Sequence, residues 1–267
     1  MKKNVSVGIV GNGFVGNAVY QNLRDKARCK VFDVDKNRSL NTLEEVINQD
    51  FIFVCLPTPM KSTGECDLVI LDNFFEELPN HLTGTFVIKS TVPIGTTKKY
   101  TERHNVIHNP EFLTARNAVE DFGKAERNVV GGDRELCVDF TCFFEACFPK
   151  IPSIIVSSDE SEAIKYFSNT FLAYKVAYFN KIHDLCKAVG MNYTNVRRGV
   201  SSDSRIGKSH TQVPGIDNDR GFGGTCFPKD LNSLIVQFDE HGVNSDMFKE
   251  VWKYNQEIRT VIDWPVT

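Results

Sequence analysis

Short apolar segments alternate with longer segments of helical spacing through the first 155 residues of the chain. The expected strands are residues 5–10, 29–34, 51–55, 85–90, 129–130 and 154–156. Helices are expected over residues 14–24 and 136–148, and a further helix, capped by Asp67, is expected to run through Leu78. Strands that alternate with helices in this way predict a parallel, doubly wound α/β sheet.

The pattern changes near residue 158. Residues 159–189 contain no glycine or proline, and apolar side chains recur around most of the helical circumference, which predicts one long helix. Ser158 and Asp159 would cap it and Gly190 would end it. The apolar positions are Ala163, Phe167, Phe171, Tyr174, Tyr178, Ile182, Leu185 and Val189.

Beyond this helix the chain is expected to be helical, with one long irregular segment. Helices are predicted over residues 193–200, 229–240 and 245–262. Residues 201–229 are rich in Gly, Ser, Asp and Pro, and a loop of that length in a compact protein is typically functional. These patterns predict two domains, an α/β domain over residues 1–157 and a helical domain over residues 158–267.

Composition and charge narrow the classes of function. The formal net charge is −3, which argues against binding nucleic acid or an anionic membrane through bulk charge. No apolar run approaches the roughly 20 residues that span a bilayer, and the N-terminus leads into a strand rather than a cleavable signal. We therefore expect a cytoplasmic protein with no nucleic-acid or membrane partner.

The eight cysteines are interpreted as neither metal ligands nor disulfide partners. They form no Cys-x-x-Cys pair, and no histidine cluster has zinc-ligand spacing. This usage indicates a reducing compartment and no metal site. Seven of the cysteines are interpreted as small apolar packing residues, and Cys226 is the exception.

A glycine-rich motif follows the first expected strand and opens the first expected helix. In Gly11-Asn12-Gly13-Phe14-Val15-Gly16, the first glycine would allow a tight turn, the second would let backbone approach a pyrophosphate, and the third would let helix and strand pack closely. The next strand ends near Asp33, whose carboxylate could accept the ribose hydroxyls and repel a 2′-phosphate. Asp35 is the rival for this role. The motif predicts NAD rather than NADP as cofactor.

The segment 221–230, Gly-Phe-Gly-Gly-Thr-Cys-Phe-Pro-Lys-Asp, is the most unusual stretch of the sequence. Cys226 stands where a loop gives way to a helix, and helix N–H groups with Lys229 nearby would favour a thiolate. Beside a nicotinamide, such a cysteine would support oxidation through a thiohemiacetal to a thioester. The alternative is that Cys226 is a buried small hydrophobe.

Two other segments fit this chemistry. Lys165 and Asn169 are four residues apart on the long helix, so they face the same way and could stabilise an oxyanion. By themselves, a lysine and an asparagine at this spacing more often form a solvated helix face. Glu111 lies in a short turn after an apolar strand and could act as a base or as a cap.

Taken together, these motifs resemble the UDP-glucose/GDP-mannose dehydrogenase family, in order and along almost the whole chain. The resemblance implies a Rossmann-like NAD-binding domain, then a long central helix and a small helical domain for dimerisation and catalysis. It also implies two successive NAD-dependent oxidations at C6 of UDP-glucose to give UDP-glucuronate. The matching segments are residues 11–16, 33, 57–59, 89–93, 109–113, 165–175, 205–207 and 221–230.

The resemblance further implies a role for individual residues. Cys226 would be the nucleophile, Lys165 and Asn169 would stabilise oxyanions, and Asp230 would support the catalytic water or the lysine. Thr91 would hold that water, and Glu111 would assist proton transfer in thioester hydrolysis. The implied cofactor contacts are Gly11, Gly13, Phe14, Val15, Gly16, Asp33, Arg38, Pro57, Thr58, Ser90, Thr91 and Lys229. The implied substrate contacts are Glu111, Phe112, Leu113, Lys165, Asn169, Arg205, His210, Val213, Pro214, Gly215 and Gly223.

The sequence departs from the family pattern in two places. Many members carry a second glutamate where this chain has Ala115, which removes a cofactor contact. Members usually continue into a second, nucleotide-binding domain, whereas this chain stops at Thr267. The sequence leaves open a natural minimal enzyme or a truncated product, and because all recognised catalytic groups are present we expect a working minimal enzyme. Members also pair along the long helix, so a homodimer is expected in which Arg205 reaches the nucleotide sugar of the other subunit.

The sequence leaves three alternatives open. The substrate could be another UDP- or GDP-hexose. The chain could be a two-electron β-hydroxyacid dehydrogenase, although that class needs no nucleophilic cysteine such as Cys226. It could also be an inactive NAD-binding subunit, a hypothesis that the missing nucleotide domain favours.

Overall fold

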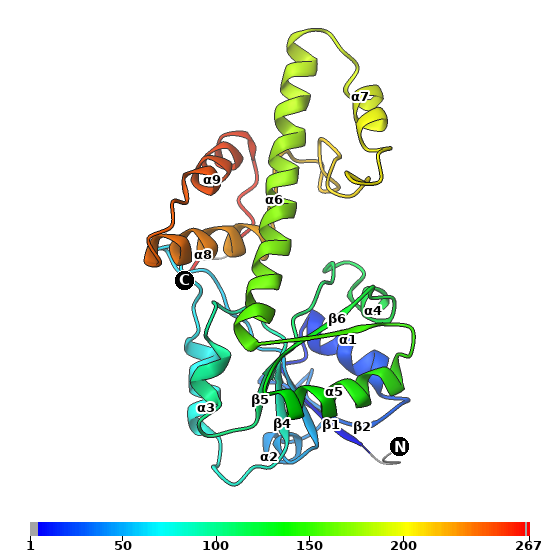
Figure 1. Cartoon of the computed structure of the whole chain (residues 1–267), viewed down its shortest axis with the longest axis vertical. Coiled ribbons are helices and arrows are strands. Elements are labelled where there is room, and N and C mark those ends of the chain that lie inside the picture. The colour runs from blue at the N-terminus through cyan, green and yellow to red at the C-terminus, as the bar shows by residue number, and fades with distance from the viewer. Residues whose placement is uncertain (1–4, 265) are drawn as a thin grey trace. The chain divides into compact units, whose positions relative to one another are not determined.

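The computed structural model describes residues 5–264 and 266–267, and the chain divides into two compact units (Figure 1). Unit 1 comprises the residues up to Thr58 together with Leu68–Lys165. Unit 2 comprises Pro59–Asp67 and Tyr166–Thr267. Helix α6 (Ser158–Ala188) contributes its first turns to unit 1 and the remainder to unit 2.

Unit 1 is built on a seven-stranded sheet of order β2-β1-β3-β4-β5-β6-β7. Every neighbouring pair is parallel except β5 and β6, which are antiparallel, so the expectation of a wholly parallel sheet is wrong at that pair. The segment between them folds onto α1 through α4, and the chain enters β6 from the edge at which β5 ends. The strands are β1 (Ser6–Val10), β2 (Arg28–Phe32), β3 (Phe51–Val54), β4 (Thr85–Ile88), β5 (Val106–His108), β6 (Asn128–Gly132) and β7 (Ser153–Val156).

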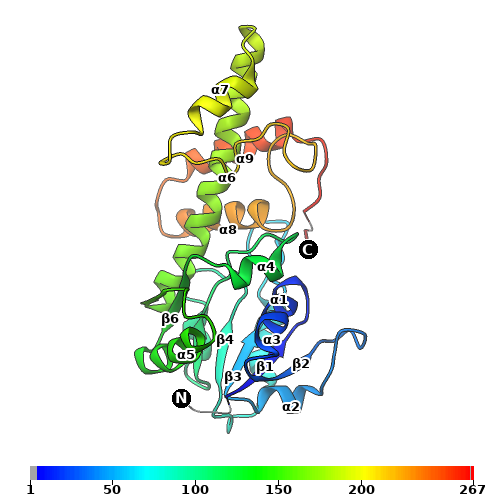
Figure 2. The same ribbon diagram turned by 90° about the vertical axis from the view of Figure 1, so that its right-hand side faces the viewer.

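Helices cover both faces of this sheet, which confirms the doubly wound α/β fold (Figures 1 and 2). Alternate strand residues point to opposite faces. Phe51 and Phe53 join one core with Phe140 of α5, whereas Ile52 joins the other core with Leu71 of α3. The helical elements are α1 (Phe14–Leu23), α2 (Leu43–Ile47), α3 (Val69–Glu77), the 3₁₀ helix η1 (Thr97–Tyr100), α4 (Ala118–Gly123) and α5 (Arg134–Cys147).

Two helix starts differ from the sequence expectation. Helix α3 begins after Leu68, whose side chain makes no cap hydrogen bond, and the Asp67 N–H donates to the Pro59 carbonyl. The N-cap thus lies one residue later than the cap expected at Asp67. Helix α2, which the apolar pattern did not predict, begins with a reciprocal capping box between Thr42 and Glu45. Helix α2 has five residues, which are too few for apolar positions to show a helical periodicity.

Unit 2 packs α8 (Phe227–Glu240) and α9 (Asp246–Ile258) against α6, with α7 (Tyr193–Val200) after the turn that ends α6. Its core joins Ala173 and Ala177 of α6 with Leu231 of α8 and Val251 of α9. Helix α8 runs across α6 (Figure 2). The start of α6 is capped by Ser157, which exchanges hydrogen bonds with Glu160, rather than by Ser158 or Asp159.

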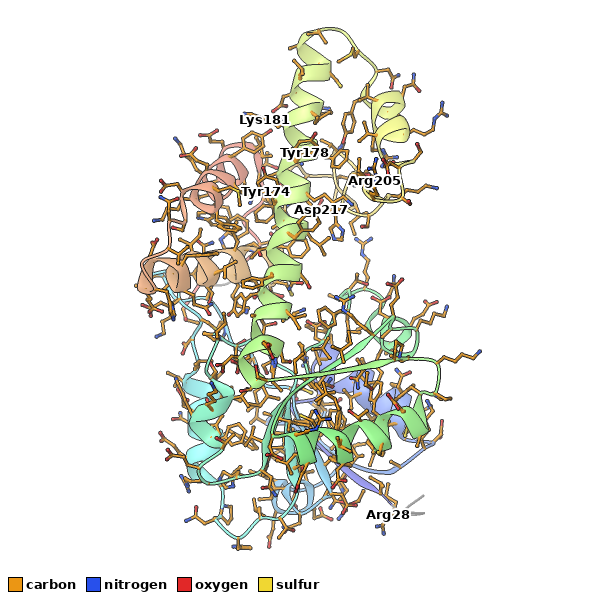
Figure 3. All side chains as sticks on the ribbon, in the orientation of Figure 1. Arg28, Tyr174, Tyr178, Lys181, Arg205 and Asp217 are labelled. Carbon is orange, nitrogen blue, oxygen red and sulfur yellow. The ribbon has the colours of Figure 1, made fainter. Side chains whose placement is uncertain are left out.

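Helix α6 is apolar on two faces, and only one of them is covered by the described part of unit 2. Ala173 and Ala177 are buried, whereas Phe167 and Phe171 are 51% and 66% exposed. The exposed side chains form one stripe, since they recur at spacings of three, four and seven residues. Figure 3 labels Tyr174 and Tyr178 within it. The stripe consists of Phe167, Phe171, Tyr174, Tyr178, Leu185 and Val189.

Candidate functional site

The glycine motif joins β1 to α1 in unit 1, and its three glycines have different surroundings. Gly11 has φ +87°, and a Cβ on it would lie 2.6 Å from the Cys55 carbonyl oxygen. A Cβ on Gly16 would lie 1.9 Å from the Gly11 carbonyl oxygen. A Cβ on Gly13 would meet no atom within 4 Å. Packing therefore demands glycine at the first and third positions, while the second faces open space that a ligand can enter.

The first turn of α1 is suited to an anion. Gly13 is its N-cap and provides no side-chain hydrogen bond, and no acidic residue stands in that turn. The first N–H groups of a helix lack intrahelical acceptors and lie at the positive end of its dipole. The buried Asn12 Oδ1 next to this turn also has no hydrogen-bond partner in the part of the chain that the structure describes. These features fit the pyrophosphate and neighbouring groups of a dinucleotide.

Asp33 lies directly beside the glycine motif, whereas Asp35 is one step further out. The Asp33 Oδ2 accepts the Asn12 N–H at 2.6 Å, and its Oδ1 accepts the Asp35 N–H at 2.8 Å. Arg38 accepts a hydrogen bond from Asn12 Nδ2 through its carbonyl and pairs with Asp35 at 3.4 Å. A hollow of about 470 Å³ opens here, lined by Asn12, Gly13, Phe14, Asn17, Tyr20, Gln21, Asn37, Arg38 and Leu40.

The loops after β3 and β4 are tied to one another. Thr58 Oγ1 donates to the Thr91 carbonyl at 2.9 Å, and Ser90 Oγ donates to the Leu56 carbonyl at 2.5 Å. Pro57 is exposed between these anchors. The four expected cofactor contacts Pro57, Thr58, Ser90 and Thr91 thus share one edge of the sheet, at the carboxyl ends of two parallel strands. Ligands of doubly wound sheets bind at that edge.

A buried cluster of charges lies in the same unit. Lys165 Nζ is 2.9 Å from Glu111 Oε1, and both side chains are more than nine-tenths buried. Glu111 Oε2 accepts the Leu113 N–H, so the carboxylate is held at both oxygens. Lys89 Nζ donates to Asn109 Oδ1 at 2.9 Å and to the Pro110 carbonyl at 3.4 Å. Glu111 is therefore the ion-pair partner of Lys165 and not the cap of a helix.

Lys89 gives this cluster an excess of positive charge. Burial lowers the pKa of Lys89 to about 8, with Cys55 and Glu111 opposing the shift and Lys165 adding to it. Burial also raises the pKa of the Cys55 thiol to about 12, so that thiol is protonated at neutral pH. Two ammonium groups thus share the single carboxylate of Glu111. A cluster of this kind favours an anion or a developing oxyanion nearby.

Two cations lie close to the aromatic ring of Phe112. The Arg127 guanidinium is 4.1 Å from the centre of its ring, and Lys165 Nζ is 5.4 Å from it. These contacts lie within the range of cation–π attraction. Leu113 is half-buried against the core of unit 1.

In unit 2, Cys226 is the N-cap residue of α8. Thr225 Oγ1 lies 3.7 Å from its sulfur. Position at a helix N-terminus favours the thiolate form of a cysteine. None of the eight cysteines forms a disulfide. Cys142 on α5 is exposed, so its interpretation as a packing residue is wrong, because α5 presents this position to solvent.

Asp230 contacts an expected catalytic residue, Asn169, and an expected cofactor contact, Lys229, at the start of α8. Asn169 Nδ2 donates to Asp230 Oδ2 at 2.6 Å, and Lys229 Nζ is 2.6 Å from Asp230 Oδ1. Burial opposes the charged form of Lys229, but Asp230, Cys66 and Cys226 together raise its pKa above the ordinary value. Lys229 is thus a buried ammonium ion whose nearest carboxylate is Asp230.

The glycines before Cys226 are explained mainly by protein atoms. A Cβ on Gly221 would lie 2.3 Å from Asn255 Oδ1, and a Cβ on Gly223 would lie 2.1 Å from Arg259 Nη2. At these two positions the missing Cβ therefore makes room for Asn255 and Arg259. Gly224 has φ +75° and open space beside it. Sequence reasoning missed Asn255 and Arg259, because nothing in a helix pattern marks them as partners of a distant loop.

The residues expected to contact substrate from the long loop are spread along it. Arg205 is 88% exposed in its side chain and pairs with Asp203 (Figure 3). His210 adopts φ 60°, and the Val213–Pro214 peptide bond is cis. The Gly215 N–H donates to the Asp219 carbonyl, closing a tight turn. Contacts within the described residues do not bring Arg205 to Cys226.

Within residues 5–264 and 266–267, no group of three or more His, Cys, Asp or Glu side chains is arranged to hold a metal ion. Across the same residues, no helix combines the length and the apolar character needed to cross a membrane.

Comparison with known proteins identifies both units. Residues 39–143 match the NAD binding domain of the UDP-glucose/GDP-mannose dehydrogenase family, and residues 159–257 match its central domain. The chain is 32% identical over 249 residues to UDP-glucose 6-dehydrogenase of Rickettsia conorii, covering 90% of this chain and 56% of that protein. It thus spans a little over half of the length of that relative.

Two solved structures share the fold of this chain. A UDP-glucose dehydrogenase from Pyrobaculum islandicum matches with a TM-score of 0.84 and 27% identity, over 95% of this chain and 68% of that one. A 3-hydroxyisobutyrate dehydrogenase from Mycobacterium tuberculosis matches with a TM-score of 0.74 and 15% identity, over 95% and 94%. The second likeness concerns the fold alone.

Proposed function

Because the chain belongs to the UDP-glucose/GDP-mannose dehydrogenase family, we propose that it is an NAD-dependent nucleotide-sugar dehydrogenase. In this proposal it oxidises the C6 hydroxyl of UDP-glucose to a carboxylate, with two NAD reduced for each sugar. The observation that carries the proposal is Cys226 at the start of α8, next to the buried network of Asn169, Lys229 and Asp230. A two-electron alcohol dehydrogenase has no need for a cysteine so placed.

The cofactor would be held by residues 1–157, with the pyrophosphate at the start of α1 and the adenosine ribose beside Asp33. When bound, NAD supplies the hydride acceptor for each oxidation. Asp33 already accepts two backbone N–H groups, and each carboxylate oxygen retains a lone pair for a ribose hydroxyl. A 2′-phosphate at the same place would meet this negative charge directly.

Replacing Asp33 with alanine is expected to narrow the preference for NAD over NADP. The change removes both the acceptor for the ribose hydroxyls and the repulsion of a 2′-phosphate. The ratio of kcat/KM for the two cofactors should fall about tenfold or more, as expected for the loss of a charged hydrogen bond of about 1.5–3 kcal/mol. Asp35→Ala is the matched control and should leave the ratio near the wild-type value. Equal efficiency of the unaltered protein with NADP would contradict this assignment.

The chemistry would be carried by residues 158–267 together with Glu111 and Thr91. The Cys226 thiolate would attack the C6 aldehyde that the first oxidation produces, forming a thiohemiacetal. Lys165 and Asn169 would stabilise its oxyanion, and Asp230 would hold the Asn169 amide. The second oxidation gives a thioester, which water held by Thr91 would hydrolyse with Glu111 as base.

We also propose a homodimer paired along the exposed stripe of α6. The stripe exposes six apolar side chains, and a contiguous exposed patch of that kind typically marks an interface. Two copies related by a twofold axis would cover it with the same surface of each. In that arrangement Arg205 would reach the nucleotide sugar held by the other subunit, joined by the loop with His210 and Val213–Gly215. A guanidinium forms paired hydrogen bonds with phosphate oxygens.

Arg205→Ala is expected to raise KM for the nucleotide sugar by roughly ten- to a hundredfold, corresponding to about 1.5–3 kcal/mol for a hydrogen bond to a charged group. Mixing this variant with Cys226→Ala should restore activity, because one of the two sites in a mixed dimer has both residues. Arg198→Ala, which replaces an exposed arginine on α7, is the control and should leave KM for the nucleotide sugar near the wild-type value. An active monomer in sedimentation, or no restored activity despite proven subunit exchange, would contradict the shared site.

The experiment that tests the proposed function is a substrate screen with the purified chain. UDP-glucose, GDP-mannose and UDP-N-acetylhexosamines are each incubated with NAD, and the NADH released per sugar is counted. We expect two NADH with UDP-glucose. NADH release with a different nucleotide sugar would support a nucleotide-sugar dehydrogenase with another substrate. No NADH release with any of these sugars would instead favour an NAD-binding subunit without dehydrogenase activity.

A second candidate is a two-electron β-hydroxyacid dehydrogenase. The observation in its favour is the fold likeness to the 3-hydroxyisobutyrate dehydrogenase, which extends over nearly the whole of both chains. Such an enzyme would release one NADH per substrate and would not depend on Cys226. The stoichiometry of NADH therefore separates the two candidates.

A further inference from the structure

The loop that leads to Cys226 is bound at several points by the end of α9 and the residues after it. Asn255 accepts the Phe222 N–H at 2.7 Å and donates to the Phe222 carbonyl at 2.9 Å. The Gly224 N–H donates to Asp263 Oδ1 at 2.9 Å. Each of these contacts joins residues more than thirty positions apart in sequence, just before the N-cap of α8.

Arg259 connects both ends of this loop. Its side chain is 2% exposed, and its Nη2 lies 2.9 Å from Asp217 Oδ2 and 3.1 Å from Asp263 Oδ2. Its Nη1 donates to the Arg220 carbonyl at 3.3 Å. A buried guanidinium in a planar fork fixes the direction of each partner as well as its distance.

Gly223 shows how closely this guanidinium approaches the loop. A Cβ on Gly223 would lie 2.1 Å from Arg259 Nη2 and 2.2 Å from Asp263 Oδ1. Backbone, guanidinium and carboxylate are therefore in direct contact, with no room for a side chain between them. A change at Arg259 or Asp263 would be transmitted to the backbone two to three residues before Cys226.

We propose that Arg259 and Asp263 are positioning residues that set the place of the Cys226 thiol at the start of α8. This inference deepens the proposed function, because it takes Cys226 as the nucleophile. Asp263 accepts a hydrogen bond from the Gly224 N–H, and Arg259 forms ion pairs with Asp263 and Asp217. These contacts fix the loop in the absence of substrate. Misplacing a reacting atom by about 1 Å can cost on the order of a hundredfold in rate.

The test compares Asp263→Ala with Asp263→Asn and with a control. The asparagine retains an acceptor for the Gly224 N–H and loses only the charge that faces Arg259. Asp239→Asn is the matched control, because Asp239 pairs with Lys249 on exposed surfaces of α8 and α9 and is not bonded to this loop. Each protein is measured for thermal unfolding, for kcat and KM, and for alkylation of each cysteine by iodoacetamide over a series of pH values, resolved by peptide mass spectrometry.

We expect Asp263→Ala to lower kcat about ten- to a hundredfold with KM for NAD unchanged. It should also alter the pH profile of Cys226 alkylation relative to the exposed Cys142, which serves as the internal reference. Asp263→Asn should lie between alanine and wild type, and Asp239→Asn should match wild type. If Asp263→Ala does not fold, Asp263→Asn and Arg259→Lys should show the lower kcat and the altered pH profile of Cys226 alkylation.

A folded Asp263→Ala with wild-type kcat and an unaltered Cys226 alkylation profile would overturn the proposal. Alkylation requires no turnover, so this readout separates the proposal from the proposed function. If the wild-type chain oxidises no nucleotide sugar, the function fails, while the alkylation profiles still decide whether Arg259 and Asp263 position Cys226.

Discussion

Cys226→Ser is expected to lower the overall four-electron turnover of UDP-glucose by several orders of magnitude. A serine hydroxyl is a far poorer nucleophile toward an aldehyde than a thiolate at the start of a helix. Without the covalent adduct, the second oxidation has no thiohemiacetal to act on. The measurement is the NADH released per UDP-glucose over time, with the sugar product identified by mass spectrometry.

Cys142→Ser is the matched control for this substitution. Cys142 is an exposed thiol on α5, so its replacement should leave both turnover and folding near wild type. A small early release of NADH by Cys226→Ser is compatible with the mechanism, because the first oxidation does not need the thiol. Formation of UDP-glucuronate by Cys226→Ala at the wild-type rate would exclude Cys226 as the nucleophile.

Much of unit 1 could be predicted because its signals are local. The strand β3 is apolar at every position and lies between turn residues, which is typical of a strand buried on both faces. The glycine motif is a contiguous segment, and the turn at Gly11 and the close packing at Gly16 follow from the missing Cβ atoms. Helix α6 is long and free of Gly and Pro, so its bounds were predicted to within a residue or two.

What could not be predicted depends on pairs that are distant in the sequence. Glu111 could be a base or a cap until its ion pair with Lys165, 54 residues away, was visible. Arg259 lies in an amphipathic helix terminus, where an arginine ordinarily faces solvent, and its three carboxylate partners come from two other segments. The antiparallel pairing of β5 with β6 is likewise a property of the chain path and not of either strand.

Glu111→Gln is expected to have the second large effect, because Glu111 pairs with Lys165 in a cluster that also holds Lys89. Losing its charge leaves two buried ammonium groups facing a neutral amide. Removing one partner of a buried pair typically costs about 3–5 kcal/mol in the free energy of unfolding. Loss of the proposed base should also slow thioester hydrolysis by roughly 10²- to 10⁴-fold. The two effects have different origins and can be separated.

The separating variant is Lys89→Gln combined with Glu111→Gln. It removes one of the two unpaired ammonium groups while leaving an N–H donor for Asn109, so urea unfolding should show part of the lost stability regained. Hydrolysis should stay slow, and intact-protein mass spectrometry should show the acyl adduct accumulating on Cys226 in both variants. Glu120→Gln, which removes an exposed carboxylate paired with Lys124, is the control and should cost less than about 1 kcal/mol. Normal turnover of Glu111→Gln with no adduct on Cys226 would exclude Glu111 as the base and leave it only the role of holding Lys165.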